Sequence, residues 1–315
     1  MKEPTRKDRM EHWLLQLLEG GVSRLSDSTA ARVGGMLGAV IRPAGIRRAT
    51  VEANLRLAFP DRDESWREDV VRATYRHLGR EAVAMLRLSH HTREEIVRLT
   101  DIPALDWEAF EAARAEGRGV LLVTGHYGNW EAAAAAVAAR GIPVAAVVKA
   151  LRNPLVDEQL KAARERLGIQ TIDMRDAPRR MPRVLAQGGV IGIVADQDAR
   201  SSGVWVPFFG VPASTYRGPA LFALRFQAPV IAAVARRLPD GRYRIQGERM
   251  ATPRSGDLER DVTDLTRALA AHLESEIRKE PGQYFWFHKR WKTRPQTEPG
   301  TTPDGTNTRI PHPSD

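Results

Sequence analysis

The chain has 315 residues, a net charge of +9 and no cysteine, so disulfides, thiolate metal ligands and cysteine nucleophiles are excluded. The charge comes mainly from arginine, since only seven lysines are present. It favours an anionic partner such as a lipid surface, an acidic carrier or nucleic acid, while a GC-rich coding bias would also enrich arginine. No stretch approaches the roughly 20 apolar residues that span a bilayer, and the N-terminus makes a poor signal peptide.

The N-terminal part is predicted to be helical. Within residues 10–41, apolar side chains such as Trp13, Leu14 and Leu17 recur at spacings of three and four. This segment either packs on its own domain or lies in a membrane interface with Trp13 near the headgroups. Further helices are predicted over "RRATVEANLRLAFPDR", ending at Pro60, and over "SWREDVVRATYRHLGREAVAMLRL", with Ser65 as N-cap.

From about residue 119, apolar runs of strand type alternate with helical patterns. The predicted strands are 119–124, 143–149, 189–195, 229–236 and "RYRIQGERM". The predicted helices are 130–140, 154–167, 178–187, 216–226 and 257–279. This alternation predicts an α/β fold with a largely parallel central sheet covered by helices on both faces.

The chain is expected to have three parts. Residues 1–100 form an N-terminal helical, membrane-associating region, and residues 101–294 form the α/β core. Residues 295–315, rich in Pro and Thr, hold one aliphatic residue, Ile310. Such a segment cannot bury enough surface to offset its ordering entropy, so a disordered tail is predicted.

The turn "VTGHYGNWE", residues 123–131, carries the candidate chemistry. Gly125 and Gly128 permit a sharp turn, and Asn129 is a good N-cap that places Glu131 in the first helical turn. On one helix, residues five apart point about 140° away from each other, so His126 can meet Glu131 only from the turn. An imidazole held by a carboxylate is a general base. The alternative is a capping histidine and a first-turn glutamate without chemistry.

The base would act directly on a substrate hydroxyl. No Gly-x-Ser-x-Gly elbow and no cysteine occur, so no covalent nucleophile is evident. No His-Glu-x-x-His occurs and the other histidines are scattered, so no metal site is predicted.

Five segments of the chain, in order, carry a family resemblance. They are "RRATVEANLRLAFPD", "GRGVLLVTGHYGNWE", "VVKALRNPLVDEQLKAARERLG", "GGVIGIVADQDARSSGVWVPFFGVPASTYRGPALFALRFQAPVIAAVARR" and "PGQYFWFHKRWKTRP". Over roughly residues 10–295 the chain resembles the lysophospholipid-acyltransferase-like family. This family includes the lipid A late acyltransferases, which transfer lauroyl and myristoyl chains, and the phosphatidylinositol mannoside acyltransferase.

The resemblance implies an O-acyltransferase with an H-x4-D/E motif in which His126 is the base. It implies an acyl thioester donor, on acyl carrier protein or CoA, and no cofactor. The implied acceptor is a membrane glycolipid, first a lipid A precursor and as the alternative another glycolipid such as phosphatidylinositol mannoside. It places the enzyme at the cytoplasmic face of the inner membrane. Many members have an apolar N-terminal span, whereas this N-terminus is polar enough that attachment to the membrane surface alone is expected. A non-catalytic membrane- or nucleic-acid-binding protein is the competing interpretation.

Further candidates lie where predicted strands end, at the edge where open α/β sheets bind ligands. The candidates for substrate binding are Lys149, Arg152, Asn153, Arg164, Asp196, Asp198, Phe208 and Phe209. Arg152 and Arg164 could grip phosphate or sugar oxygens, or be solvated surface charges. Asp198 could position the acceptor, orient His126 or only cap a turn.

Two aromatic segments complete the candidates. Phe208 and Phe209 could wall an acyl trough or pack in the core. The segment "YFWFHKRWKTR" suits a membrane interface or the core, and no nucleic-acid partner is expected because the chain shows no nucleic-acid motif.

Overall fold

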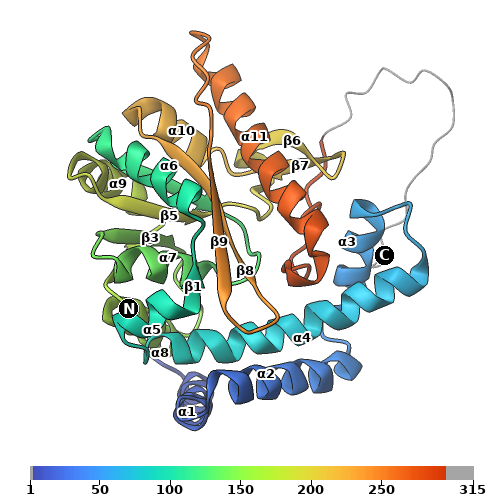
Figure 1. The fold of residues 1–315 in the computed structure, drawn as a ribbon. Coiled ribbons are helices and arrows are strands. Elements are labelled where there is room, and N and C mark those ends of the chain that lie inside the picture. The colour runs from blue at the N-terminus through green and yellow to red at the C-terminus, as the bar shows by residue number, and fades with distance from the viewer. Residues whose placement is uncertain (1–2, 296–315) are drawn as a thin grey trace, which may run out of the picture.

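The computed structural model describes residues 3–295 and has a seven-stranded sheet at its centre (Figure 1). The strand order is β1-β9-β8-β2-β5-β3-β4, and all neighbouring pairs are parallel except β8 and β9. The strands are β1 (Thr100–Asp101), β2 (Val120–Thr124), β3 (Val144–Val148), β4 (Ile169–Asp173), β5 (Val190–Val194), β8 (Val230–Arg237) and β9 (Tyr243–Arg249). The predicted α/β class is confirmed. The predicted tail, residues 295–315, lies outside the described residues except for Pro295.

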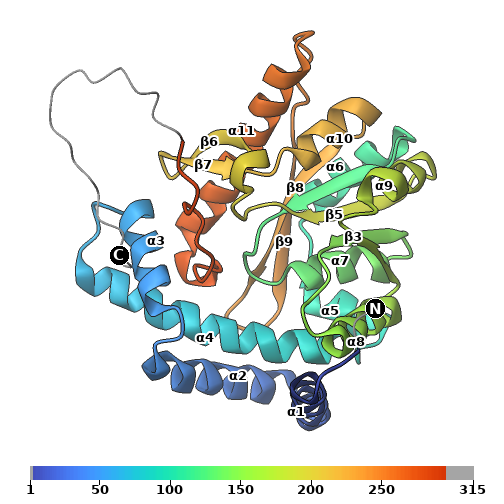
Figure 2. The ribbon, with the colours of Figure 1, turned by 180° about the vertical axis from the view of Figure 1, so that it is seen from behind.

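Helices lie on both faces of the sheet (Figures 1 and 2), and the central strands β2 and β8 are largely buried between them. Val120 of β2 packs with α5 (Arg93–Leu99), α6 (Ala104–Ala115) and α7 (Trp130–Ala139). The next residue, Leu121, points the other way and packs with α9 (Ala177–Ala186), α10 (Gly218–Phe226) and α11 (Leu258–Lys279). Such two-sided burial explains why these strands read as continuous apolar runs.

Four strands were not predicted, for local reasons, and the first of them, β1, has only two residues. The edge strand β4 alternates apolar with polar residues, "IQTID", and is too short to be distinguished from a loop. Strands β6 (Val204–Phe208) and β7 (Val211–Thr215) form a separate antiparallel hairpin. Pro207 and Pro212 made this segment look like a loop, and a two-stranded ribbon tolerates them because it has open edges.

The N-terminal region holds five α-helices rather than three, because the first predicted segment is divided in two and α5 was not predicted. The predicted segment 10–41 divides into α1 (Arg6–Val22) and α2 (Asp27–Ile41), because Ser26 accepts a hydrogen bond from the Thr29 N–H and starts a new helix. Helix α3 (Arg48–Ala58) ends before Pro60, as predicted. The N-cap of α4 (Glu64–Leu88) is Asp63 and not Ser65, since the Asp63 carboxylate accepts the Trp66 N–H at 2.7 Å.

Helices α2 and α4 cross with their backbones in contact. A Cβ at Gly38 would lie 2.0 Å from the Tyr75 carbonyl oxygen, and a Cβ at Gly79 would lie 2.1 Å from that of Gly34. No side chain larger than hydrogen fits at these positions, so the two helices pack as one unit.

The outer sides of α1 and α2 are apolar and exposed. On α1, Trp13 and Leu17 are 57% and 55% exposed, and Met36 and Val40 on α2 are 67% and 73% exposed. These side chains recur at spacings of three and four, so they form a stripe on each helix. Among residues 3–295, no helix combines the length and the apolar character needed to cross a bilayer.

Candidate active site

His126 and Asp196 meet at the carboxyl edge of the sheet. His126 follows β2 and Asp196 follows β5, and these strands are adjacent and parallel. The imidazole Nδ1 lies 2.7 Å from Asp196 Oδ1, and the His126 backbone N–H donates to Asp196 Oδ2 at 2.9 Å. One buried carboxylate therefore fixes both the ring and the backbone of His126.

The pair leaves His126 with one nitrogen available. Because Nδ1 faces a carboxylate, it carries the proton, and Nε2 is the basic nitrogen. No hydrogen bond to Nε2 occurs within residues 3–295, and the side chain is 22% exposed. Burial lowers the pKa of His126, but the charge and hydrogen bond of Asp196 outweigh it, so its pKa is raised. Burial opposes ionisation of Asp196, yet the contacts with His126 hold the pKa of that carboxyl well below its ordinary range.

Aromatic rings and the C-terminal segment enclose the turn. The Trp130 ring meets the imidazole edge-on with centroids 4.7 Å apart, and the Phe285 N–H donates to the His126 carbonyl at 2.9 Å. The backbones of Tyr127 and Tyr284 form an isolated antiparallel β-bridge, and the Trp286 side chain is fully buried. Of the two interpretations of "YFWFHKRWKTR", core packing is therefore the one that applies to these rings.

Glu131 does not contact His126. Helix α7 begins at Trp130 and Asn129 caps it, as predicted, with its side chain accepting the Ala132 N–H at 2.9 Å. The Glu131 carboxylate, however, takes a forked pair of hydrogen bonds from Arg164 of α8 (Pro154–Arg166), at 3.0 and 2.6 Å. The expected His126–Glu131 contact is wrong, because the imidazole pairs with Asp196 and the Glu131 carboxylate pairs with Arg164.

A buried polar network holds the turn against α4. The Asn129 Nδ2 donates to Glu81 Oε2 at 2.9 Å, and the Tyr243 hydroxyl donates to the same oxygen at 2.7 Å. Arg237 donates to the other Glu81 oxygen at 3.0 Å. Gly128 is required here, since its φ is +58° and a Cβ would lie 1.9 Å from the Ala235 carbonyl oxygen. No sequence pattern points to Glu81, because it lies in the middle of the long helix α4.

Four of the candidates for substrate binding have internal partners, and the first, Asp196, holds His126 instead of a substrate. Asp198 is buried, accepts from the Thr293 hydroxyl at 2.9 Å, and donates its backbone N–H to His288. It therefore does not orient His126. Asn153 caps α8 and donates to Glu11 of α1 at 3.0 Å. Arg164 is held by Glu131 and is not free to grip a phosphate.

Lys149 and Arg152 are open to solvent. Both lie in the loop after β3, two strands from β2 in the sheet, and are exposed. No ion pair within residues 3–295 involves either of them, so they are the free cations nearest this edge among the candidates.

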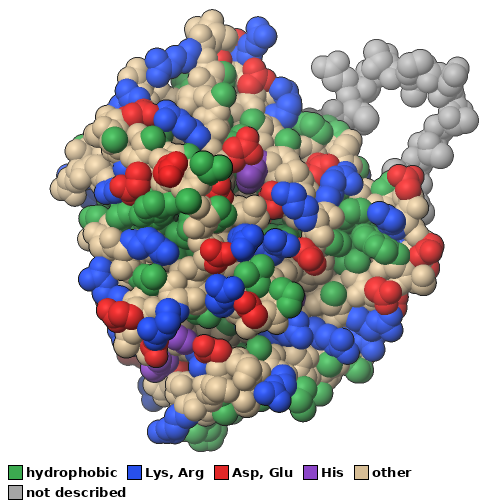
Figure 3. Space-filling model, viewed as in Figure 1, with side chains coloured by type: hydrophobic (Ala, Val, Ile, Leu, Met, Phe, Trp, Pro, Cys, Tyr) green, Lys and Arg blue, Asp and Glu red, His purple; other side chains and the backbone are tan. Residues whose placement is uncertain are grey.

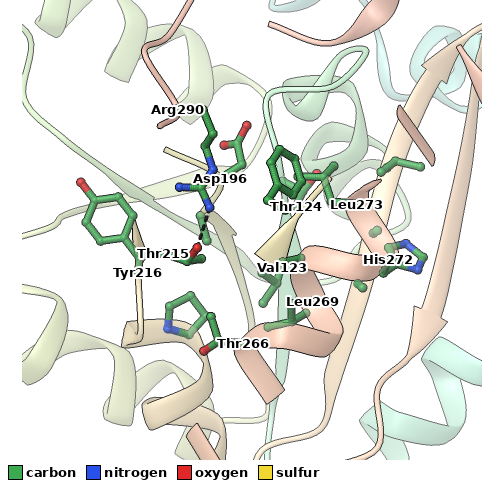
Figure 4. A pocket seen from close by; sticks show the side chains of 17 residues that line it. Val123, Thr124, Asp196, Thr215, Tyr216, Thr266, Leu269, His272, Leu273 and Arg290 are labelled. Carbon is green, nitrogen blue, oxygen red and sulfur yellow. Dashed lines mark hydrogen bonds between the residues drawn. The ribbon is translucent and has the colours of Figure 1, made fainter. Parts of the chain in front are cut away.

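The two phenylalanines are buried and face different surroundings. Phe208 lines a largely apolar cavity that reaches Asp196, together with Val123, Leu269 and Leu273 (Figure 4). At the polar end of this cavity the buried Arg290 donates to Thr215. Phe209 does not line the cavity but packs against Phe59 and Trp286 in the core. Within the described part of the chain, no group of three or more His, Asp or Glu side chains could hold a metal ion.

Comparison with known proteins places the chain among lipid acyltransferases. Residues 6–293 match the family described as bacterial lipid A biosynthesis acyltransferase. The chain is 29% identical to a lipid A biosynthesis lauroyltransferase of Escherichia coli K12, over 80% of this chain and 81% of the relative. It is 27% identical to a lipid A biosynthesis palmitoleoyltransferase of the same organism, over 84% and 86%. It is also 28% identical to a phosphatidylinositol mannoside acyltransferase of Mycolicibacterium smegmatis, over 71% and 73%.

Proposed function

Because the chain belongs to the bacterial lipid A biosynthesis acyltransferase family, we propose that it moves a fatty acyl chain from acyl carrier protein to a lipid A precursor. That it is an O-acyltransferase acting on a glycolipid follows from the family. The identity of the donor and of the acceptor is the proposal. The observation that supports the chemistry best is His126, whose Nδ1 is held by Asp196 while Nε2 is unpaired within residues 3–295.

The reaction uses His126 as a base and then as an acid. Nε2 removes the proton from a glycolipid hydroxyl as its oxygen attacks the thioester carbonyl carbon. The buried Asp196 carboxylate stabilises the imidazolium that forms. The carbon–sulfur bond then breaks, and the imidazolium returns the proton to the leaving thiolate. An ester and a thiol are the products, and His126 is neutral again.

Other residues are proposed for binding. The cations Lys149 and Arg152 are exposed beyond β3 and suit anionic groups of either substrate. Phe208 lines the small apolar cavity that reaches Asp196 and is proposed to contact the acyl chain next to the thioester. Glu131 and Arg164 join α7 to α8 and position the helix that follows the catalytic turn.

We further propose peripheral attachment to the cytoplasmic face of the inner membrane. The exposed stripes of α1 and α2 suit the headgroup boundary of a bilayer. The protein should bind anionic vesicles, and high salt should weaken binding because it screens surface charge. Resistance to both salt and alkaline carbonate would instead indicate an integral protein.

The mechanism is tested with His126→Ala. Transfer of a lauroyl chain from acyl carrier protein to a lipid A precursor in detergent should fall by about 10²- to 10⁴-fold. Circular dichroism should show an intact fold. Turnover like that of the wild type would reject the general-base role.

The acceptor is tested in cells. Mass spectrometry of membrane lipids from a deletion strain should show a lipid A species that lacks one acyl chain. Loss of an acyl chain from a mannosylated inositol lipid would instead favour the function named for the Mycolicibacterium relative.

A further inference from the structure

A groove rich in arginine lies between the α2/α4 pair and the turn of the β8–β9 hairpin. Its volume is about 570 Å³, and neither His126 nor Asp196 lines it. Five arginines do: Arg32 of α2, Arg76 and Arg80 of α4, and Arg236 and Arg237 at the end of β8. Basic side chains gather over α4 on this side of the molecule, next to hydrophobic side chains over α2 (Figure 3).

Most of this positive charge is not neutralised. Three acids also line the groove, but Asp27 accepts from Arg87 at 2.6 Å and Asp240 accepts from Arg242 at 2.8 Å. Both of those arginines lie outside the groove lining. The third acid, Glu280, is 4.0 Å from Arg236.

Three of the groove arginines have no acidic partner. Arg237 is paired with Glu81. No ion pair within residues 3–295 includes Arg32, Arg76 or Arg80. The groove therefore presents three uncompensated guanidinium groups.

We propose that this groove binds the phosphate headgroup of an anionic membrane phospholipid. Forked guanidinium groups match phosphate oxygens in geometry and charge. A lipid headgroup is favoured over a soluble phosphate because Arg32 lies one helical turn before the exposed Met36, and the exposed Val40 lies one turn further. A lipid whose phosphate sits at Arg32 can lay its chains along this apolar side of α2. The inference rests on the membrane attachment proposed above, but not on the chemistry at His126.

The test measures binding of a short-chain lipid to the full-length protein. Dihexanoyl phosphatidylglycerol, kept below its micelle concentration, is titrated by calorimetry, with dihexanoyl phosphatidylcholine as the neutral comparison. The groove variant is R32Q/R76Q. The matched control is R72Q/R98Q, which loses the same charge from exposed sites on α4 and α5 outside the groove.

Phosphatidylglycerol should bind the wild type more tightly than phosphatidylcholine. At about five-fold per arginine, the groove variant should bind it about 25-fold more weakly. The control should bind it within about two-fold of wild type. Thermal unfolding checks that all variants are folded.

Several outcomes would overturn the proposal. Equal losses in the two variants would show attraction by net charge only. Equal binding of the two lipids would exclude headgroup recognition. Glycerol phosphate binding as tightly as the lipid would indicate a site for soluble phosphates. A groove that binds only the acidic carrier protein, with no lipid, would be a protein-docking surface.

The result is independent of the catalytic mechanism. His126→Ala should bind phosphatidylglycerol as the wild type does. Lipid binding without acyl transfer by the wild type would reject the proposed function and leave the groove assignment standing.

Discussion

Two carboxylates lie close to the turn that carries His126, and each makes an ion pair of a different kind. Asp196 holds an imidazole, which gains and loses a proton near neutral pH and keeps Nε2 unpaired within residues 3–295. Glu131 holds the guanidinium of Arg164, which stays protonated and occupies both carboxylate oxygens. The first pair can therefore move a proton, whereas the second can only fix α7 against α8. The type of cation, and not the presence of a carboxylate, separates the two functions.

The contrast between the two ion pairs holds only if Asp196 is required for acyl transfer. Replacing Asp196 with Asn keeps the shape of the side chain but removes the charge that stabilises the imidazolium. Turnover should fall by about 10²- to 10⁴-fold, measured at saturating substrate in detergent. An Asn variant with wild-type turnover and an intact fold would leave Asp196 as a purely structural partner.

The pH dependence sharpens the same contrast. His126 must be neutral to act as a base, so the wild-type rate should fall as the pH drops through the raised pKa of His126. Without the Asp196 charge this pKa is lower, and the acid limb of the residual activity should move to lower pH. In Glu131→Gln the acid limb should stay in place. The test is the pH–rate profile of the wild type, the Asp196 variant and the Glu131 variant. A shift of the acid limb in the Glu131 variant alone would make Glu131 the partner of His126 and Asp196 the structural carboxylate.

The second pair should contribute to stability more than to catalysis. Glu131→Gln leaves Arg164 without its anion in a partly buried place, so unfolding should become easier by about 1–3 kcal/mol. Turnover should stay within about ten-fold of wild type. A double-mutant cycle with Arg164→Gln, followed by denaturant unfolding, measures the coupling. Additive effects of the two changes would mean that the pair is not coupled.

The smallest effect is expected at Asp198. Thr293→Val removes the hydroxyl that donates to this carboxylate and should cost about 0.5–1.5 kcal/mol of stability. The pH–rate profile should not change, because Asp198 does not contact His126. A shifted profile would bring Asp198 back as a partner of the base.

The parts of the site that depend on local sequence could be predicted. Gly125, Gly128 and Asn129 set the turn and the start of α7, and the apolar run before them predicts the strand. The position of Asp196 at the same edge could also be predicted, because it ends an apolar strand. Its partnership with His126 could not, since it depends on β5 lying next to β2, which neighbouring residues do not encode.

Distant packing explains the other differences. The direction of Glu131 depends on where α8 lies, and Asn153 is occupied because α1 packs against α8. The hairpin of β6 and β7 was hidden because its prolines are typical of loops. The missed contacts of the site join segments far apart in the chain, whereas the missed strands and helix boundaries have local causes.

The contact between α2 and α4 at their glycines fixes the distance between α2 and the turn that carries His126. Because Gly34, Gly38 and Gly79 bring the two backbones into contact, α2 cannot roll or slide on α4 unless the backbones separate. Helix α4 also holds the loop that carries His126, because Asn129 donates a hydrogen bond to Glu81 of α4. If α2 rests on the bilayer as proposed, the imidazole stands at a constant distance above the lipid surface. A glycolipid would then be acylated at the hydroxyl that reaches this level, so acceptor choice would be set partly by elevation above the membrane and not only by the shape of a pocket.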